Sequence, residues 1–140
     1  GQPVLRKSKK IWRNGPKVNR EEKETPTKRF TFGDPYEGES SVTVWCDGRD
    51  YDPITEMYRP IYSYSIVTPK WRYDANDIFG AYHEMPNLDL ASRSLWAFLL
   101  SCVEAQDENS ENYGLFPEQV REWAQHFSDE ITVEYIQLKR

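Results

Sequence analysis

The chain has 140 residues, of which 38% are apolar, 29% charged and 14% aromatic, and its formal net charge at pH 7 is −5. This length is typical of one domain, and the five Trp, nine Tyr and six Phe argue against wholesale disorder because each ring buries a large area. No apolar run reaches the roughly 18 residues needed to cross a bilayer, and no charged-then-apolar leader opens the sequence. We therefore expect a soluble, cytoplasmic protein that does not bind membranes.

Charge is distributed unevenly along the chain. Residues 1–29 hold ten Lys or Arg and three Glu, a balance of +7, whereas residues 30–140 hold eight basic and twenty acidic residues, a balance of −12. Prolines interrupt the first segment, which has too few apolar residues to fold alone. The sequence predicts a basic arm at 1–29, flexible or ordered by a partner, and a single domain at 30–140.

The densest basic segment of the arm is RKSKKIWR, in which five cations surround an isoleucine and a tryptophan. Cations attract phosphate, while an indole can stack on a base or fill a protein pocket. A solvated tail and an arm folded back on the acidic body are the alternatives. The segment predicts a partner-binding site, and its residues are Arg6, Lys7, Lys9, Lys10, Ile11, Trp12 and Arg13.

Three antiparallel strands are expected after the arm. RFTFGDP alternates two phenylalanines with polar residues, and SVTVWCDGRDY places Val42 and Val44 on one face. Asp47-Gly48 is typical of a type I′ hairpin turn, which requires positive φ at both central positions. YSYSIV, closed by a proline on either side, alternates in the same manner and predicts the third strand.

The next stretch, TPKWRYDANDIFG, combines aromatic rings with carboxylates. We expect a turn in which Asp and Asn side chains accept backbone hydrogen bonds while the rings pack on the following helix. Its carboxylates lack a recognised metal-ligand spacing, and CDGRDYDPITE fails the calcium-loop pattern. Exposed Tyr and Trp are favoured at binding hot spots, so the stretch is also a possible second partner surface. The residues of that surface are Trp71, Tyr73, Asp74 and Asp77.

Two helices and a final strand are expected in the second half. NLDLASRSLWAFLLSCVEAQ has apolar residues at three- and four-residue steps, with Asn87 or Asp89 as N-cap. FPEQVREWAQHF predicts a second helix that begins at Pro117, and ITVEYIQLK alternates like a strand. The predicted fold class is α+β: a small antiparallel sheet of about four strands with two helices packed on one face, plus an extended basic N-terminal arm.

Catalytic and cofactor motifs are not found in the sequence. Nucleotide-binding loops, nucleophile elbows and zinc-protease signatures are lacking, so we expect no catalytic residue, no metal and no cofactor. Cys46 and Cys102 are expected to be buried free thiols in a reducing compartment. An enzyme with an unrecognised acidic site is the alternative.

The segments YSIVTPKWRYDANDIFG, SLWAFLLSCVEA and LFPEQVREWAQHFSDEI together resemble short uncharacterised proteins of bacteriophages that infect actinobacteria. The resemblance covers residues 62–131 and leaves the arm outside. It implies a small phage product in the host cytoplasm and carries no activity. We expect a non-enzymatic protein that binds a host or phage protein through its arm and aromatic surface. The alternative is a protein of an RNA-rich assembly that grips nucleic acid with the arm.

Overall fold

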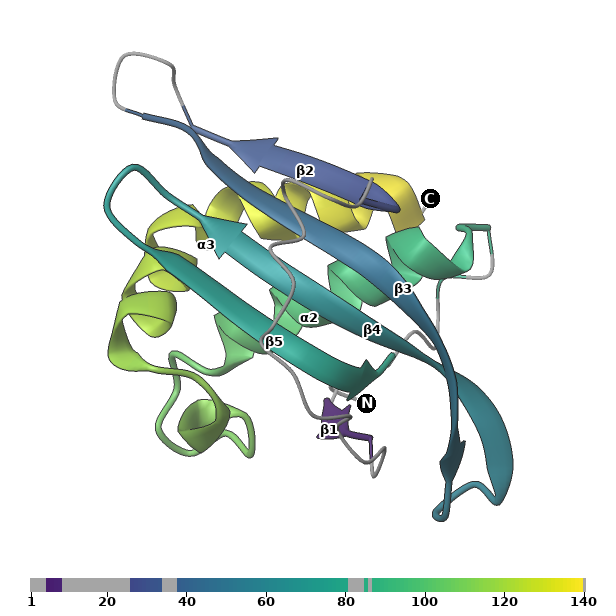
Figure 1. The fold of residues 1–140 in the computed structure, drawn as a ribbon. Coiled ribbons are helices and arrows are strands. Elements are labelled where there is room, and N and C mark those ends of the chain that lie inside the picture. Colours follow the sequence, from purple (N-terminus) through teal and green to yellow (C-terminus); the bar gives the residue numbers. More distant parts are fainter. Residues whose placement is uncertain (1–4, 9–25, 34–37, 81–84, 86, 140) are drawn as a thin grey trace.

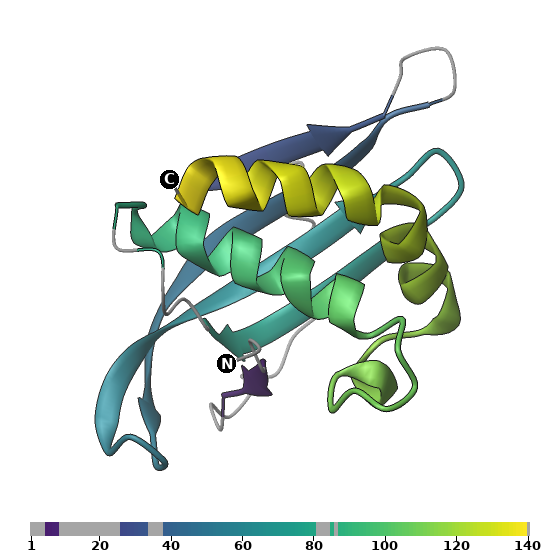
Figure 2. The same cartoon turned by 180° about the vertical axis from the view of Figure 1, so that it is seen from behind.

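The computed structural model describes residues 5–8, 26–33, 38–80, 85 and 87–139. Five antiparallel strands form one sheet in the order β1-β5-β4-β3-β2. Their bounds are β1 Arg6–Lys7, β2 Lys28–Phe32, β3 Ser40–Asp52, β4 Met57–Val67 and β5 Arg72–Phe79. Helices α2 (Leu90–Glu104) and α3 (Glu118–Lys139) cover one face of the sheet, as Figures 1 and 2 show. The predicted α+β class is confirmed, with five strands where about four were expected.

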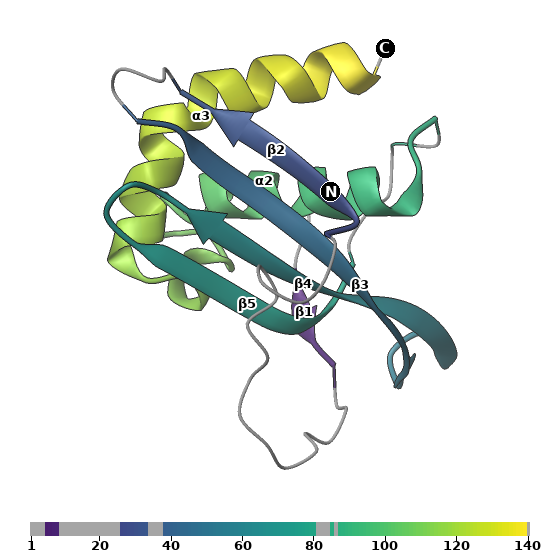
Figure 3. The same ribbon diagram turned by 45° about the horizontal axis from the view of Figure 1, so that its top comes forward.

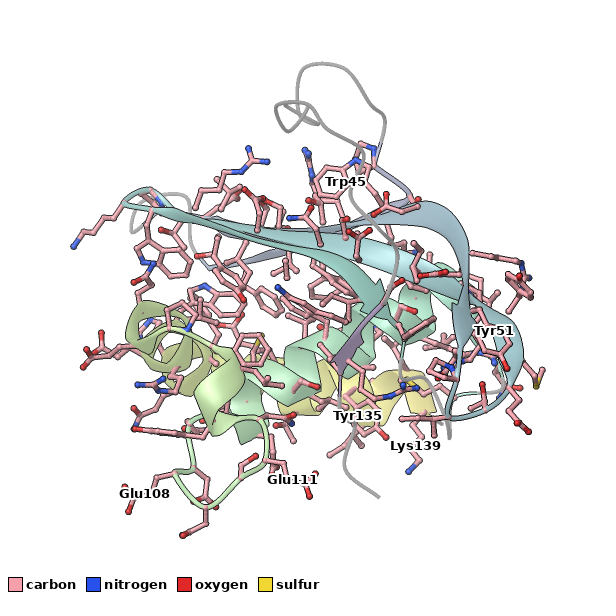
Figure 4. All side chains as sticks on the ribbon, turned by 60° about the horizontal axis from the view of Figure 1, so that its bottom comes forward. Trp45, Tyr51, Glu108, Glu111, Tyr135 and Lys139 are labelled. Carbon is pink, nitrogen blue, oxygen red and sulfur yellow. The ribbon has the colours of Figure 1, made fainter. Side chains whose placement is uncertain are left out.

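The core lies between the sheet and the two helices and is rich in aromatic rings. Tyr64 of β4 stacks on Phe98 of α2 with ring centroids 4.2 Å apart, and Phe32 of β2 meets Trp123 of α3 edge-on at 5.9 Å. Val42 and Val44 are fully buried in the same core, as the alternation predicts. Figure 4 places Trp45 on the opposite side of the sheet, away from the helices.

Helix α2 begins where the sequence predicts. The Asp89 carboxylate accepts a hydrogen bond from the backbone N–H of Ser92 at 2.8 Å, the geometry of an N-cap. This hydrogen bond, more than any other contact, lowers the pKa of Asp89. A short 3₁₀ turn, η1 (Tyr113–Leu115), then connects α2 to α3.

The strand predicted after Asp129 is wrong, because α3 continues without interruption to Lys139. The apolar residues of ITVEYIQLK fit a helix as well as a strand, since positions 131, 135 and 138 follow steps of four and three. Ile131 is fully buried, and Tyr135 and Leu138 are half-buried beside it. The helical period therefore prevails because it matches the face that packs on the core.

The turn predicted at Asp47-Gly48 is also wrong. Gly48 has φ 96°, but it lies within β3, where the register with β4 shifts between Cys46 and Arg49. The chain reverses later, between Asp52 and Met57, which are paired across the hairpin. Gly48 thus allows a bulge in a long strand, since positive φ also suits such irregularities.

The turn predicted at residues 74–77 is replaced by strand β5. The reversal comes earlier, where the Thr68 hydroxyl accepts hydrogen bonds from the backbone N–H groups of Lys70 and Trp71. Asp77, with φ 56°, lies at a second irregularity, opposite the point where β4 shifts register. Positive φ here marks a β-bulge, and the carboxylates around it belong to a strand.

Two strands extend the sheet into the predicted arm. Arg6 and Lys7 form β1 and pair with Phe79 and Ile78 of β5, and Leu5 is buried in the core. The boundary predicted between residues 29 and 30 falls inside β2. Within the described residues, neither helix is both long enough and apolar enough to cross a membrane.

Candidate functional site

The hairpin formed by β3 and β4 extends past the rest of the sheet. The pairing of β2 with β3 stops at Val44, and the pairing of β5 with β4 stops at Ile61. From Arg49 to Pro60 the two strands pair only with each other among the described residues. Figures 1 and 3 show this two-stranded hairpin protruding from the end of the sheet.

Large apolar side chains are exposed at the end of this hairpin. We call this group the hairpin tip, and its exposed fractions are Tyr51 42%, Ile54 71%, Met57 62% and Tyr58 68%. Tyr51 and Tyr58 face each other across the strands, with ring centroids 5.6 Å apart in an edge-on arrangement. Figure 4 shows Tyr51 at one end of the molecule. Adjacent exposed apolar side chains of this size are typical of interaction sites.

A buried carboxylate holds the hairpin at its root. Asp52, fully buried, accepts two hydrogen bonds from the guanidinium of Arg6, at 3.0 and 2.6 Å, and one from Arg59 at 2.8 Å. Its remaining contact is with the turn, because the N–H of Ile54 donates to it at 2.9 Å. The carboxylate therefore ties β1, β3, β4 and the turn together.

Both guanidinium groups of this cluster also lie against one aromatic ring. The guanidinium carbons (Cζ) of Arg6 and Arg59 lie 5.3 and 5.6 Å from the ring centroid of Phe79 in β5, within the range of a cation–π contact. Arg59 in addition donates to the carbonyl of Gly80 at 2.6 Å. We call Arg6, Asp52, Arg59 and Phe79 the hairpin anchor. Four of the five strands contribute to it.

The anchor determines the protonation state of Asp52. The hydrogen bonds from Arg6 contribute most to holding the pKa of this carboxyl far below its ordinary value of 3.8; burial opposes the shift, and Arg59 and the Ile54 N–H add to it. Asp52 is thus ionised throughout the neutral range, opposite two guanidinium groups. A carboxylate with three donor groups and no access to solvent is suited to holding the structure together.

The predicted arm site is only partly within the described residues. Lys9, Lys10, Ile11, Trp12 and Arg13 lie outside them, so the role predicted for these five stays a prediction. Arg6 is engaged with Asp52, and Lys7 is exposed beside β5. Leu5, which the sequence assigns to the flexible or partner-ordered arm, is instead buried in the core of the domain.

The second predicted surface does not form one patch. Tyr73, Asp74 and Asp77 line a cavity of about 340 Å³ beside β1, whereas Trp71 lines a separate cleft next to α3. Asp74 pairs with Arg72 at 3.1 Å, and Asp77 is buried at the bulge. Burial raises the pKa of the Tyr73 hydroxyl. These residues are mainly parts of the sheet edge.

The two cysteines differ in their exposure to solvent. Cys102 is buried as predicted, and burial raises its pKa well above the ordinary value, whereas Cys46 is exposed, contrary to the prediction. Neither cysteine is in a disulfide. No cluster of three or more His, Cys, Asp or Glu in metal-binding proximity occurs in the part of the chain that the structure describes.

The hairpin tip was missed from the sequence because the turn was placed at Asp47-Gly48. If the chain turned at Asp47-Gly48, the segment YDPITEMYR would lie beyond the turn and would be interpreted as an acidic loop. The available signal was the length of the alternating pattern: tyrosines stand at positions 51 and 58 with Pro53 between them. A turn over residues 53–56, which begins at that proline, makes the two tyrosines cross-strand neighbours.

Known proteins give no guide to these surfaces. No family model, no curated protein and no solved structure matches this chain.

Proposed function

We propose that this protein is a non-enzymatic binding protein that inserts its hairpin tip into an apolar pocket of a protein partner. The observation that carries the proposal is the group of four large apolar side chains exposed together at the end of a protruding hairpin. Tyr and Met are enriched in interface cores, and clustered anchors of this kind supply most of the binding energy.

The hairpin anchor supports this role by fixing the tip in advance. Binding costs less when the interacting segment is already ordered, because side chains and backbone lose less freedom on association. Asp52 connects the turn to β1 and β4 through Arg6 and Arg59, so the orientation of the hairpin is coupled to the sheet. The cross-strand contact of Tyr51 and Tyr58 restricts the two rings further.

The charge of the hairpin favours a protein over a polyanion. Residues 49–59 contain two arginines and three carboxylates, and one arginine already pairs with Asp52. A segment without excess positive charge has little attraction for phosphates or anionic lipid headgroups. The resemblance to actinobacteriophage proteins suggests where to search: the cytoplasm of an infected actinobacterial cell.

The test compares hairpin-tip variants with a matched control. Each protein is used to capture partners from a lysate of infected actinobacterial cells. Ile54→Ser and Tyr58→Ser each remove an exposed apolar side chain, and Leu115→Ser does the same in η1, far from the hairpin; Leu115 is 50% exposed. We expect both tip variants to lose, after nuclease treatment, one specific protein that the wild type and the Leu115→Ser control retain. Retention by all variants, or loss of the protein on nuclease treatment of the wild type, would refute the proposal.

Trp12→Ala separates the hairpin from the predicted arm site. A hot-spot indole in the interface would weaken binding by roughly 30-fold or more, whereas an arm outside the interface leaves affinity unchanged. We expect Ile54→Ser and Tyr58→Ser to weaken binding strongly and Trp12→Ala to bind nearly as well as the wild type. The reverse ranking would assign binding to the arm.

A further inference from the structure

A second cleft lies at the end of the sheet opposite the hairpin tip. It has a volume of about 550 Å³ and is bounded by Gly33 and Gly38 beside the paired ends of β2 and β3, by the connection of β4 to β5, and by one face of α3. The end of β2 at Phe32 pairs with the start of β3 at Ser40, and the β4–β5 connection lies at the same end of the sheet, whereas the β3–β4 turn lies at the other (Figure 1). We call this hollow the α3 cleft.

Aromatic rings form much of the wall of the α3 cleft. Trp71 comes from the β4–β5 connection, while Trp123, His126 and Phe127 come from α3. Trp123 and Phe127 have centroids 5.7 Å apart, and Phe127 contacts His126 edge-on at 4.7 Å. Faces of such rings attract cations, and guanidinium groups stack on indoles especially well.

Carboxylates stand at both ends of this aromatic wall. Glu122 and Glu130 line the cleft from α3, and both are exposed. Neither is in an ion pair within the described residues. Lys70, on the opposite side, is the one cationic side chain among the lining residues. Two unpaired carboxylates around aromatic rings are complementary to a basic ligand.

The two carboxylates are too far apart for a single cation. Glu122 and Glu130 are eight residues apart on the helix, which corresponds to about 12 Å along its axis. An extended peptide rises roughly 3.3 Å per residue, so positions four apart span a similar distance. Side chains at positions one, three and five of such a peptide point the same way. The middle one would then face the aromatic wall.

We propose that the α3 cleft binds an extended segment of a protein partner that carries two arginines four positions apart and an apolar residue midway between them. The arginines pair with Glu122 and Glu130, and the apolar residue covers Trp123 and Phe127. Arginine suits the two outer positions because its planar guanidinium pairs with carboxylates and can also stack on a neighbouring ring of the wall. This site is independent of the hairpin tip.

Two further observations fit a preformed binding surface. Trp123 is only 6% exposed and its indole ring packs against Phe127, so it is held in place before any partner binds. The facing wall is closely packed, since a Cβ added at Gly38 would approach Pro69 Cγ to 2.6 Å. Gly38 also has φ 97°, so only glycine is comfortable there.

The test uses three short peptides and the full chain. The probe is acetyl-Arg-Ser-Leu-Ser-Arg-amide; its neutral control replaces both arginines by glutamine, and its spacing control is acetyl-Arg-Arg-Leu-Ser-Ser-amide. Affinity is followed by the indole N–H signals of Trp71 and Trp123 in nuclear magnetic resonance spectra, assigned with the variants Trp71→Phe and Trp123→Phe. We expect the spaced arginine peptide to shift both signals. It should bind at least roughly four-fold tighter than the neutral control, which loses both ion pairs, and roughly two- to five-fold tighter than the spacing control, which loses one.

Variants of the protein complete the test. Glu122→Gln and Glu130→Gln are each expected to weaken the probe by roughly two- to five-fold, and Lys70→Gln to strengthen it, because it removes the competing cation. Glu108→Gln, in the α2–α3 connection (Figure 4), is the matched control and leaves affinity unchanged. Equal binding of the glutamine peptide, or affinity insensitive to both Glu122→Gln and Glu130→Gln, overturns the proposal. So does an absence of any shift at Trp71 and Trp123.

Discussion

Arg6 donates two hydrogen bonds to Asp52, 46 positions further along the chain, and so connects the first strand to the root of the protruding hairpin. This contact makes the N-terminal residues part of the domain. It also means that the presentation of the hairpin tip depends on a charge pair that is removed from water on one side, because Asp52 is fully buried. Loss of one partner from a buried pair leaves an uncompensated charge.

Asp52→Asn tests the anchor through pH. The pKa of Asp52 is lowered in the folded state, so its contribution to the free energy of unfolding is complete above the ordinary value of 3.8 and declines as the pH falls below that value toward the folded pKa. We expect the variant to be less stable than the wild type at pH 7. The difference between their free energies of unfolding should become smaller below about pH 4. Urea unfolding at pH 7, 5, 4, 3 and 2 measures it.

Asp129→Asn is the control for that series, because Asp129 lies on an exposed part of α3. It should stay within about 0.5 kcal/mol of the wild type, as surface substitutions usually do. A gap between Asp52→Asn and the wild type that is the same at every pH would show that the ionised carboxylate contributes nothing to the anchor.

Leu5→Ala tests whether the N-terminal residues belong to the core. Leu5 is 7% exposed, and truncation of a buried leucine costs about 2–5 kcal/mol. Lys7→Ala, two residues further along and at an exposed position of β1, should change the free energy of unfolding by no more than about 0.5 kcal/mol. Chemical denaturation distinguishes the two. Equal, small effects would place Leu5 outside the core.

Ile131→Ala and Val133→Ala distinguish a helix from a strand at the C-terminal end. On α3, Ile131 is buried and Val133 is 51% exposed, whereas in a strand the two side chains would share one face. We expect a loss of about 2–5 kcal/mol for Ile131→Ala and a much smaller one for Val133→Ala. Comparable losses from both substitutions would favour the strand.

Local signals in the sequence account for much of the fold. The period of α2 and its Asp89 cap, and the alternation at Val42 and Val44, are confirmed because local pattern and burial agree there. Where two periods fit equally, at residues 131–138, packing against the core decides, and the sequence alone does not show that face. The turn was misplaced because Gly48 suits a bulge as well as a hairpin.

The candidate sites depend on contacts between distant segments, which the sequence shows least clearly. The anchor joins Arg6, Asp52 and Arg59, and only the strand order brings the first of these beside the other two. The α3 cleft likewise combines Trp71 with a helix face some 50 residues later. Trp71 was predicted as a surface residue, but its neighbours Tyr73 and Asp74 belong to another cavity.

The most direct measurement of the central claim is site-specific photo-crosslinking in the cells that the resemblance suggests, actinobacteria infected by a phage. A benzophenone amino acid replaces Ile54 at the hairpin tip, and in a second variant it replaces Glu108 in the exposed α2–α3 connection. Our account predicts one discrete protein adduct from position 54, lost when Tyr58→Ser is added, and none of that mass from position 108. The same adduct from both positions, or no protein adduct from position 54, would contradict it.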